Sequence, residues 1–106
     1  MSEALDKLFA TIAARKGADP GTSYTAKLLA AGVEKCAKKF GEEATEAVIA
    51  AIQKDKTELA KESADVLYHL AVLWAASGIT PEDVYAVLKS RESQSGLEEK
   101  ASRPKG

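Results

Sequence analysis

The sequence predicts an all-α protein, a bundle of about five helices that a second copy of the chain completes. Apolar residues recur every three or four positions through most of the chain, which is the spacing of one helix face. Alternating runs of β-branched residues, which are typical of strands, are absent. A chain of 106 residues buries only a modest core, and helical chains of this length often complete theirs by pairing.

The first predicted helix covers residues 3 to about 15. Its apolar stripe consists of Leu5, Leu8, Phe9 and Ile12. The stretch KGADPGTS that follows is rich in glycine and proline and predicts a loop. A short helix is expected over 24–31, with Thr22 or Ser23 as its N-cap and Gly32 at its end.

A long helix is expected over about 33–53. At ~100° per residue, its apolar residues form one stripe, which contains Val33, Cys36, Ala37, Phe40, Ala44, Ala47, Val48 and Ala51. Gly41 lies in the middle of this helix, where glycine costs about 1 kcal/mol relative to alanine. It therefore predicts the close approach of a neighbouring helix or a ligand.

Two further helices complete the chain. Asp55 is expected to cap the fourth helix and Gly78 to close it. Thr80, Pro81 and Asp83 then open a fifth, which ends near residue 91. We expect one domain over 1–106, with residues 92–106 as a polar C-terminal tail.

Composition narrows the classes of function. The chain is 45% apolar and 29% charged, with a net charge of −1, so no excess of positive charge predicts binding to nucleic acid or to a membrane. The most apolar run, VLYHLAVLWAASGI, is too short to span a bilayer. Cys36 is the only cysteine, which excludes a disulfide within the chain and favours a cytoplasmic location.

Four polar side chains share one face of the fourth predicted helix. Glu58, Glu62, Asp65 and His69 fall within an arc of roughly 60° at the α-helical repeat. The remaining faces are largely apolar, which predicts that this helix lies inside the bundle and that the acidic face meets another helix. Ionised carboxylates in such a place need partners.

The third predicted helix carries the stretch GEEATE, residues 41–46. The short QKDKTE connection makes this helix an antiparallel neighbour of the fourth, so Glu43 and Glu46 are expected to meet Glu62 and Asp65. Four converging carboxylates repel one another unless a cation binds, and oxygen ligands favour Mg²⁺ or Mn²⁺, as one ion or more. Because Mg²⁺ is often shared with substrate phosphates, the nearby lysines are candidate phosphate contacts: Lys35, Lys38 and Lys39.

A simpler interpretation stands beside this one. Glutamates on a helix are usually solvated and paired with lysines four residues away, and both Lys38 with Glu42 and Lys39 with Glu43 fit that spacing. A lone histidine on a buried helix is more often a core residue than a metal ligand. We therefore expect His69 to contact the ligands rather than the ion.

These residues resemble those of a known family. GEEATE followed by ESAD is similar to the E-E-x-x-E … E-x-x-D signature of the all-α nucleotide pyrophosphohydrolases, the MazG-like superfamily. Within it, the stretches SYTAKLLAAGVEKCAKKFGEEATE, ESADVLYHL, DVYAVLKSR and SGLEEKASR resemble the phosphoribosyl-ATP pyrophosphatases of histidine biosynthesis, in the expected order. The acidic signature indicates only the superfamily, whereas SYTAKLL and SGLEEKASR indicate the narrower family.

The resemblance implies hydrolysis of phosphoribosyl-ATP to phosphoribosyl-AMP and pyrophosphate by a dimeric helical enzyme. It implies that Mg²⁺ is held by the four acids named above and that Glu42 orients or deprotonates the attacking water. Lys35, Lys38 and Lys39 would hold phosphate oxygens. Arg91, Lys100 and Arg103 would engage the additional ribose phosphate if the tail folds over the substrate.

Three alternatives remain open on the sequence. One is a related MazG-like enzyme that removes non-standard nucleoside triphosphates. A second is a carboxylate-bridged di-iron bundle, which uses a Glu-x-x-His unit on each of two helices, whereas this chain has one histidine, four residues after Asp65. The third is a non-catalytic helical dimerisation module whose acids are only a solvated face.

Overall fold

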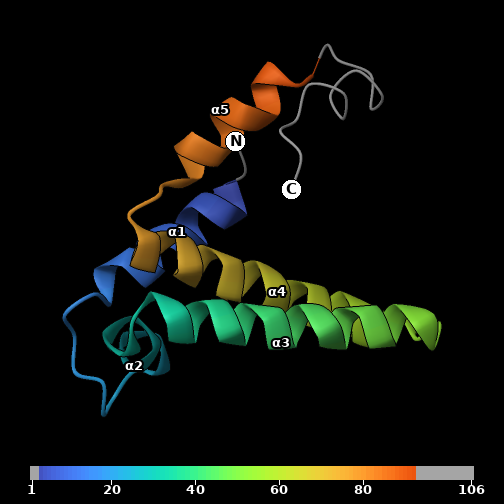
Figure 1. Ribbon diagram of the computed structural model, residues 1–106, viewed down its shortest axis with the longest axis horizontal. Coiled ribbons are helices and arrows are strands. Elements are labelled where there is room, and N and C mark those ends of the chain that lie inside the picture. The colour runs from blue at the N-terminus through green and yellow to red at the C-terminus, as the bar shows by residue number, and fades with distance from the viewer. Residues whose placement is uncertain (1–2, 93–106) are drawn as a thin grey trace.

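Residues 3–92 are described by the computed structural model, and all their regular structure is helical (Figure 1). The five helices are α1 (Glu3–Ala14), α2 (Tyr24–Ala31), α3 (Val33–Ile52), α4 (Lys56–Ser77) and α5 (Pro81–Ser90). The all-α prediction is confirmed, and each predicted helix boundary lies within about two residues of the observed one. Residues 93–106, most of the predicted tail, lie outside the described part of the chain.

Local capping interactions explain where the helices begin and end. Ser23 accepts a hydrogen bond from the Ala26 amide at the start of α2, so it is the cap, rather than Thr22. Asp55 caps α4 in the same way. Thr80 and Asp83 form a reciprocal capping box at α5. Gly78 ends α4 at φ 77°, a left-handed conformation that costs glycine little.

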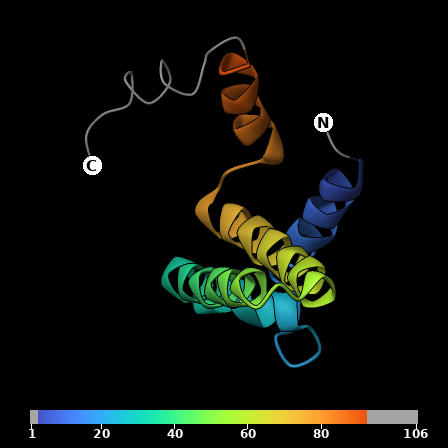
Figure 2. The ribbon, with the colours of Figure 1, turned by 90° about the vertical axis from the view of Figure 1, so that its right-hand side faces the viewer.

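The long helices α3 and α4 form an antiparallel hairpin, which is the main packing unit of the chain. Helix α1 packs on α4, and α2 packs on both members of the hairpin. Helix α5 contacts α1, where the Tyr85 hydroxyl donates to the Asp6 carboxylate across 3.2 Å. Figure 2, viewed along the hairpin, shows α1 and α5 rising on the same side of it.

The core forms where α1, α2 and the hairpin meet. Its buried members are Ile12, Leu28, Cys36, Ala71, Val72 and Ala75. The Cys36 thiol donates to the Leu28 carbonyl, which ties α2 to α3. The core therefore lies at the end of the hairpin formed by the start of α3 and the last turns of α4. Among the described helices, none is both long enough and apolar enough to cross a bilayer.

The buried face of α3 differs from the predicted stripe. Val33 and Val48 are exposed, by 46% and 56%, although the stripe placed them inside. The buried positions are Cys36 and Ala50, and Glu43 lies halfway between them at a seven-residue spacing. A seven-residue spacing is typical of the contact line between two helices packed along their length. The buried face of α3 is therefore set by its contact with α4 and not by the centre of its apolar arc. The expectation that a neighbouring helix approaches Gly41 was wrong for the described residues, because an added Cβ there would meet no atom within 4 Å.

Candidate metal and nucleotide site

Three carboxylates converge between α3 and α4. Glu43 from α3 and Glu62 and Asp65 from α4 each offer one oxygen, and these oxygens all lie within 4.8 Å of one another. On α4, Glu62, Asp65, His69 and Val72 follow one another at the alternating spacings of three and four residues that define a helix seam. The acids thus occupy positions where a helical hairpin usually places leucine or isoleucine. Burying charge there without a partner is unfavourable.

Glu62 is the most buried of these acids. It is only 9% exposed, and one of its carboxylate oxygens, Oε2, is buried without a hydrogen-bond partner among the described residues. Burial, followed by hydrogen bonding with Glu58 and Glu46, raises the pKa of Glu62 from 4.5 to about 7. A carboxylate that faces other carboxylates and has an unpartnered buried oxygen is a natural ligand for a cation.

The pKa of Glu43 is also raised. Burial raises the pKa of Glu43, and its hydrogen bond with Glu46 and the nearby charges of Glu46 and Asp65 raise it further, while Lys39 lowers it. Three of the four predicted ligands are therefore brought together directly. The fourth, Glu46, lies one helical turn along α3 and interacts with both Glu43 and Glu62.

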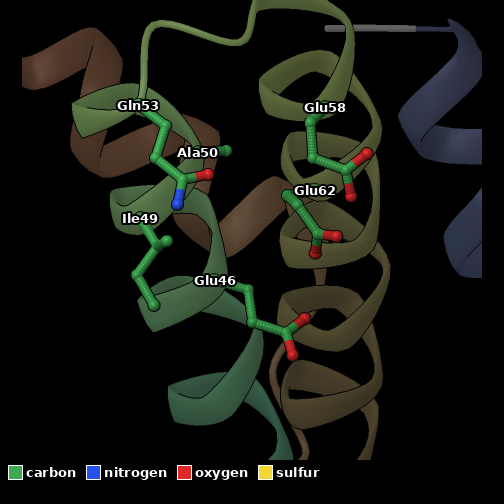
Figure 3. Close-up of a pocket in the computed structure, with 6 residues that line it drawn as sticks. All are labelled: Glu46, Ile49, Ala50, Gln53, Glu58 and Glu62. Atoms are coloured by element: carbon green, nitrogen blue, oxygen red, sulfur yellow. The ribbon is translucent and has the colours of Figure 1, made fainter.

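Glu46 and Glu62 also line a pocket of about 280 Å³ that opens between the two helices beyond the carboxylate trio. Figure 3 shows Glu46 reaching from α3 toward α4, where Glu58 and Glu62 lie one above the other. Glu58 was not among the predicted site residues. The signal was present, since Glu58 lies four residues before Glu62 on the same acidic face.

His69 lies beside the acids and is 6% exposed. Its Nε2 is 4.0 Å from Glu43 Oε1, and its Nδ1 is buried without a hydrogen-bond partner in the part of the chain that the structure describes. The rings of Tyr24 and Tyr68 meet its ring edge-on. Burial and, less strongly, Lys39 lower the pKa of His69, which favours a neutral imidazole.

The predicted basic residues divide between two places. Lys35, Lys38 and Lys39 line a second pocket together with Glu42, and Lys39 forms an ion pair of 3.2 Å with Glu42. Arg91, which follows the last residue of α5, lines a different pocket with residues such as Val87 and Leu88. Lys100 and Arg103 lie outside the described residues. The structure thus places the three lysines in one pocket, with the Lys39 charge acting on Glu43, and leaves Arg91 just beyond the end of α5.

Comparison with known proteins identifies the chain. A family model described as phosphoribosyl-ATP pyrophosphohydrolase matches residues 5–92. The chain belongs to this family. It is 61% identical over 99 residues to a phosphoribosyl-ATP pyrophosphatase of Cereibacter sphaeroides, covering 93% of this chain and 96% of that protein. It is 64% identical to the same-named protein of Parvibaculum lavamentivorans, over 93% of this chain and 91% of that one, and 62% identical to that of Paracoccus denitrificans, over 93% and 92%.

Membership of the phosphoribosyl-ATP pyrophosphohydrolase family makes the chain a hydrolase that acts on a pyrophosphate bond. The predicted resemblance is confirmed across nearly the whole chain. Enzymes of this class are generally metal-dependent, and the residues present fit a hard divalent cation. The donors are all carboxylate oxygens, they approach within ligand-sharing distance, and one of them is an unpartnered buried oxygen.

The raised pKa of Glu62 predicts how the stability of this pyrophosphohydrolase depends on pH without metal. The folded protein holds the Glu62 proton up to about pH 7, whereas the unfolded chain releases it near pH 4.5. The folded state therefore loses stability as pH rises across that window, and the loss is complete above it. Because Glu62→Gln removes this titration, the melting temperature of the wild type should fall relative to that of the variant between pH 5 and 8.

Differential scanning fluorimetry with EDTA, at several values of pH in that range, measures this difference. At saturating Mg²⁺ the melting temperatures of the wild type and the variant should change with pH in the same way, because a bound cation takes the place of the proton on Glu62. A melting-temperature difference between wild type and Glu62→Gln that stays constant with pH would show that folding does not raise the pKa of Glu62.

Proposed function

We propose that the chain catalyses the Mg²⁺-dependent hydrolysis of phosphoribosyl-ATP to phosphoribosyl-AMP and pyrophosphate, a step of histidine biosynthesis in the cytoplasm. The observation that carries the proposal is the convergence of Glu43, Glu62 and Asp65 from two helices, in a chain of the phosphoribosyl-ATP pyrophosphohydrolase family. Neither a solvated acidic face nor a di-iron site explains that arrangement. Solvated acids do not point into a helix seam, and a di-iron site of this kind uses two histidines, whereas the sequence has one.

Glu43, Glu46, Glu62 and Asp65 would hold Mg²⁺, with Mn²⁺ as the alternative. A divalent ion bound by these carboxylates neutralises phosphate charge and makes a water molecule more acidic. His69 keeps its imidazole against Glu43 and so limits the rotamers of that ligand. Glu58, one turn before Glu62 on α4, forms a hydrogen bond with Glu62 and so restrains its side chain.

The lysines beside the acids would bind the phosphate oxygens of the substrate. The charge of Lys39 lowers the pKa of Glu43, so this lysine acts on one of the converging carboxylates. The hydrogen bond from Lys39 to Glu42 raises the pKa of Lys39 and keeps it charged. Lys35 and Lys38 extend the positive surface along α3. For Arg91, Lys100 and Arg103, contact with the second phosphate of the substrate remains a prediction.

Glu42 is our candidate for positioning or deprotonating the water. It is half exposed and lies at the boundary between the lysine pocket and the carboxylates, because it lines the former and adjoins Glu43 in the sequence. An acid at that boundary can accept a hydrogen bond from a water molecule beside a bound phosphate.

We further propose that the enzyme acts as a homodimer. Val48, Ile49 and Ile52 on α3 and Leu67 on α4 are all exposed, by 48% to 75%. A second group, Ile79, Val87 and Leu88, is exposed around α5. Exposed apolar side chains grouped on the helices of a small chain are typical of an interface between identical subunits. Because Ile49 also lines the pocket of Glu46 and Glu62, this surface lies beside the acids.

The proposal is tested by mixing the purified protein with phosphoribosyl-ATP and Mg²⁺ and measuring pyrophosphate release. We expect turnover that EDTA abolishes and that added Mg²⁺ restores. Hydrolysis of canonical or damaged nucleoside triphosphates, with none of phosphoribosyl-ATP, would instead indicate a MazG-like enzyme that removes non-standard nucleotides. Absence of any Mg²⁺-dependent hydrolysis would contradict the proposed function.

A further inference from the structure

A pocket of about 320 Å³ lies between α2 and the first half of α3. Helix α2 supplies Tyr24, Lys27, Leu28 and Ala31 to its wall, and α3 supplies Lys35, Lys38, Lys39 and Glu42. Four lysines and one glutamate give the pocket a net positive charge, and the buried Leu28 gives it an apolar floor. Such a pocket suits a ligand that has both an anionic group and an apolar or ring-shaped part.

The α2 wall of this pocket is firmly held. Ser23 caps the helix, and the Cys36 thiol donates to the Leu28 carbonyl from α3. The hydroxyls of Thr25 and Tyr68 form a hydrogen bond that joins α2 to α4. The backbone that carries Tyr24 and Lys27 is therefore fixed relative to both members of the hairpin, as a binding wall requires.

Residues that line the pocket also contact, or adjoin, the residues around Glu43. Tyr24, whose side chain is half exposed, lies edge-on to His69, and His69 lies against Glu43. On the other side, Lys39 and Glu42 belong to the pocket wall and adjoin Glu43. A substrate whose triphosphate reaches the carboxylates would therefore place a neighbouring part of itself between α2 and α3.

We propose that this pocket is a second phosphate subsite and that Tyr24 and Lys27 of α2 are substrate-recognition residues. This inference rests on the proposed function. Phosphoribosyl-ATP carries anionic groups at two ends, the triphosphate and the phosphate of the added ribose, and the carboxylates with their ion engage only part of that charge. Lys27, with Lys35, binds a phosphate that the metal does not hold, and the ring of Tyr24 packs against the adjoining sugar or base.

The test compares Lys27→Gln with Lys89→Gln, a matched change at an exposed lysine of α5. For Lys27→Gln we expect the KM for phosphoribosyl-ATP at saturating Mg²⁺ to rise about tenfold, the scale of one charge-assisted hydrogen bond, with kcat little changed. Lys89→Gln should match the wild type. Tyr24→Leu should also raise KM, whereas Tyr24→Phe, which keeps the ring, should not. The increase in melting temperature on adding Mg²⁺ should be unchanged in Lys27→Gln.

Inhibition by product fragments identifies the phosphate that the pocket takes. If Lys27→Gln weakens inhibition by ribose 5-phosphate, the pocket binds the phosphoribosyl end, and if it weakens inhibition by inorganic pyrophosphate, the pocket binds the triphosphate end. A wild-type KM in both Lys27→Gln and Tyr24→Leu would overturn the subsite and leave the proposed function intact. No turnover of phosphoribosyl-ATP by the wild type would instead overturn the proposed function, and the subsite with it.

Discussion

Replacing Glu62 with glutamine is expected to abolish Mg²⁺-dependent pyrophosphate release while the helices remain formed. The amide keeps the shape of the side chain but cannot supply the anionic oxygen that the cation requires. We expect the rate to fall by at least about 10²- to 10³-fold, the scale measured when one charge-stabilising group is removed from an active site. Pyrophosphate release at saturating Mg²⁺ and far-ultraviolet circular dichroism measure the two parts of this result.

The same substitution should raise the melting temperature of the metal-free protein at pH 8. Glu62 has a buried oxygen without a partner among residues 3–92 and lies close to Glu46, Glu58 and Asp65, so removing its charge relieves repulsion. The variant should also lose the increase in melting temperature on adding Mg²⁺. This opposite effect on stability and activity is characteristic of a functional site and would not be produced by a packing defect.

Glu34→Gln is the matched control, since Glu34 is exposed in the first turn of α3 and belongs to neither pocket described above. It should leave the rate and the response to Mg²⁺ unchanged. If Glu62→Gln keeps the full rate at saturating Mg²⁺, the assignment of the metal ligands is wrong.

Introducing a charge at Ile52 is expected to dissociate the enzyme. Ile52 is 75% exposed in the single chain, beside the exposed Val48 and Ile49. A symmetric dimer would bury it twice, at about 1.5–3 kcal/mol for each copy, and Ile52→Glu replaces that gain with the cost of burying a carboxylate. The dissociation constant should therefore rise by about 10²- to 10⁴-fold. Size-exclusion chromatography with light scattering measures the mass.

Thr11→Glu, a charge added at an exposed position of α1, should leave the mass of the enzyme unchanged. The circular dichroism of Ile52→Glu should remain helical, because the side chain contributes little to the core of the single chain. A wild-type protein that elutes as a monomer at 100 times the assay concentration would contradict the proposal of a dimer. So would an Ile52→Glu variant with the mass of the wild type.

The boundaries of the helices followed from local chemistry, which is why the sequence predicted them well. Ser23, Asp55 and Thr80 each cap a helix through an interaction with a residue three positions later, and Gly78 ends α4 with its own backbone conformation. None of these interactions depends on the rest of the fold. The acidic face of α4 could also be predicted from the sequence, because the helical repeat alone places its residues on one arc.

The orientation of α3 could not be predicted in the same way. Its apolar arc contains residues that pack within the chain, such as Cys36, and residues that remain exposed, such as Val48. A helical projection combines both sets, and only the partner helix selects the seam, which places Glu43 inside and Val48 outside. Lys27 and Tyr24 were missed for a related reason, since only the packing of α2 against α3 brings them beside the lysines of GVEKCAKKF.

The carboxylates all belong to the helical hairpin, between positions 43 and 65, so the site can form as soon as α3 and α4 pair during folding. Contacts between segments so near in sequence close quickly, because little chain entropy is lost in bringing them together. The ligands can therefore assemble before the terminal helices dock, and an ion captured at that stage would favour further folding. Damage to α1 or α5 should accordingly weaken the molecule as a whole before it erases the affinity for the cation.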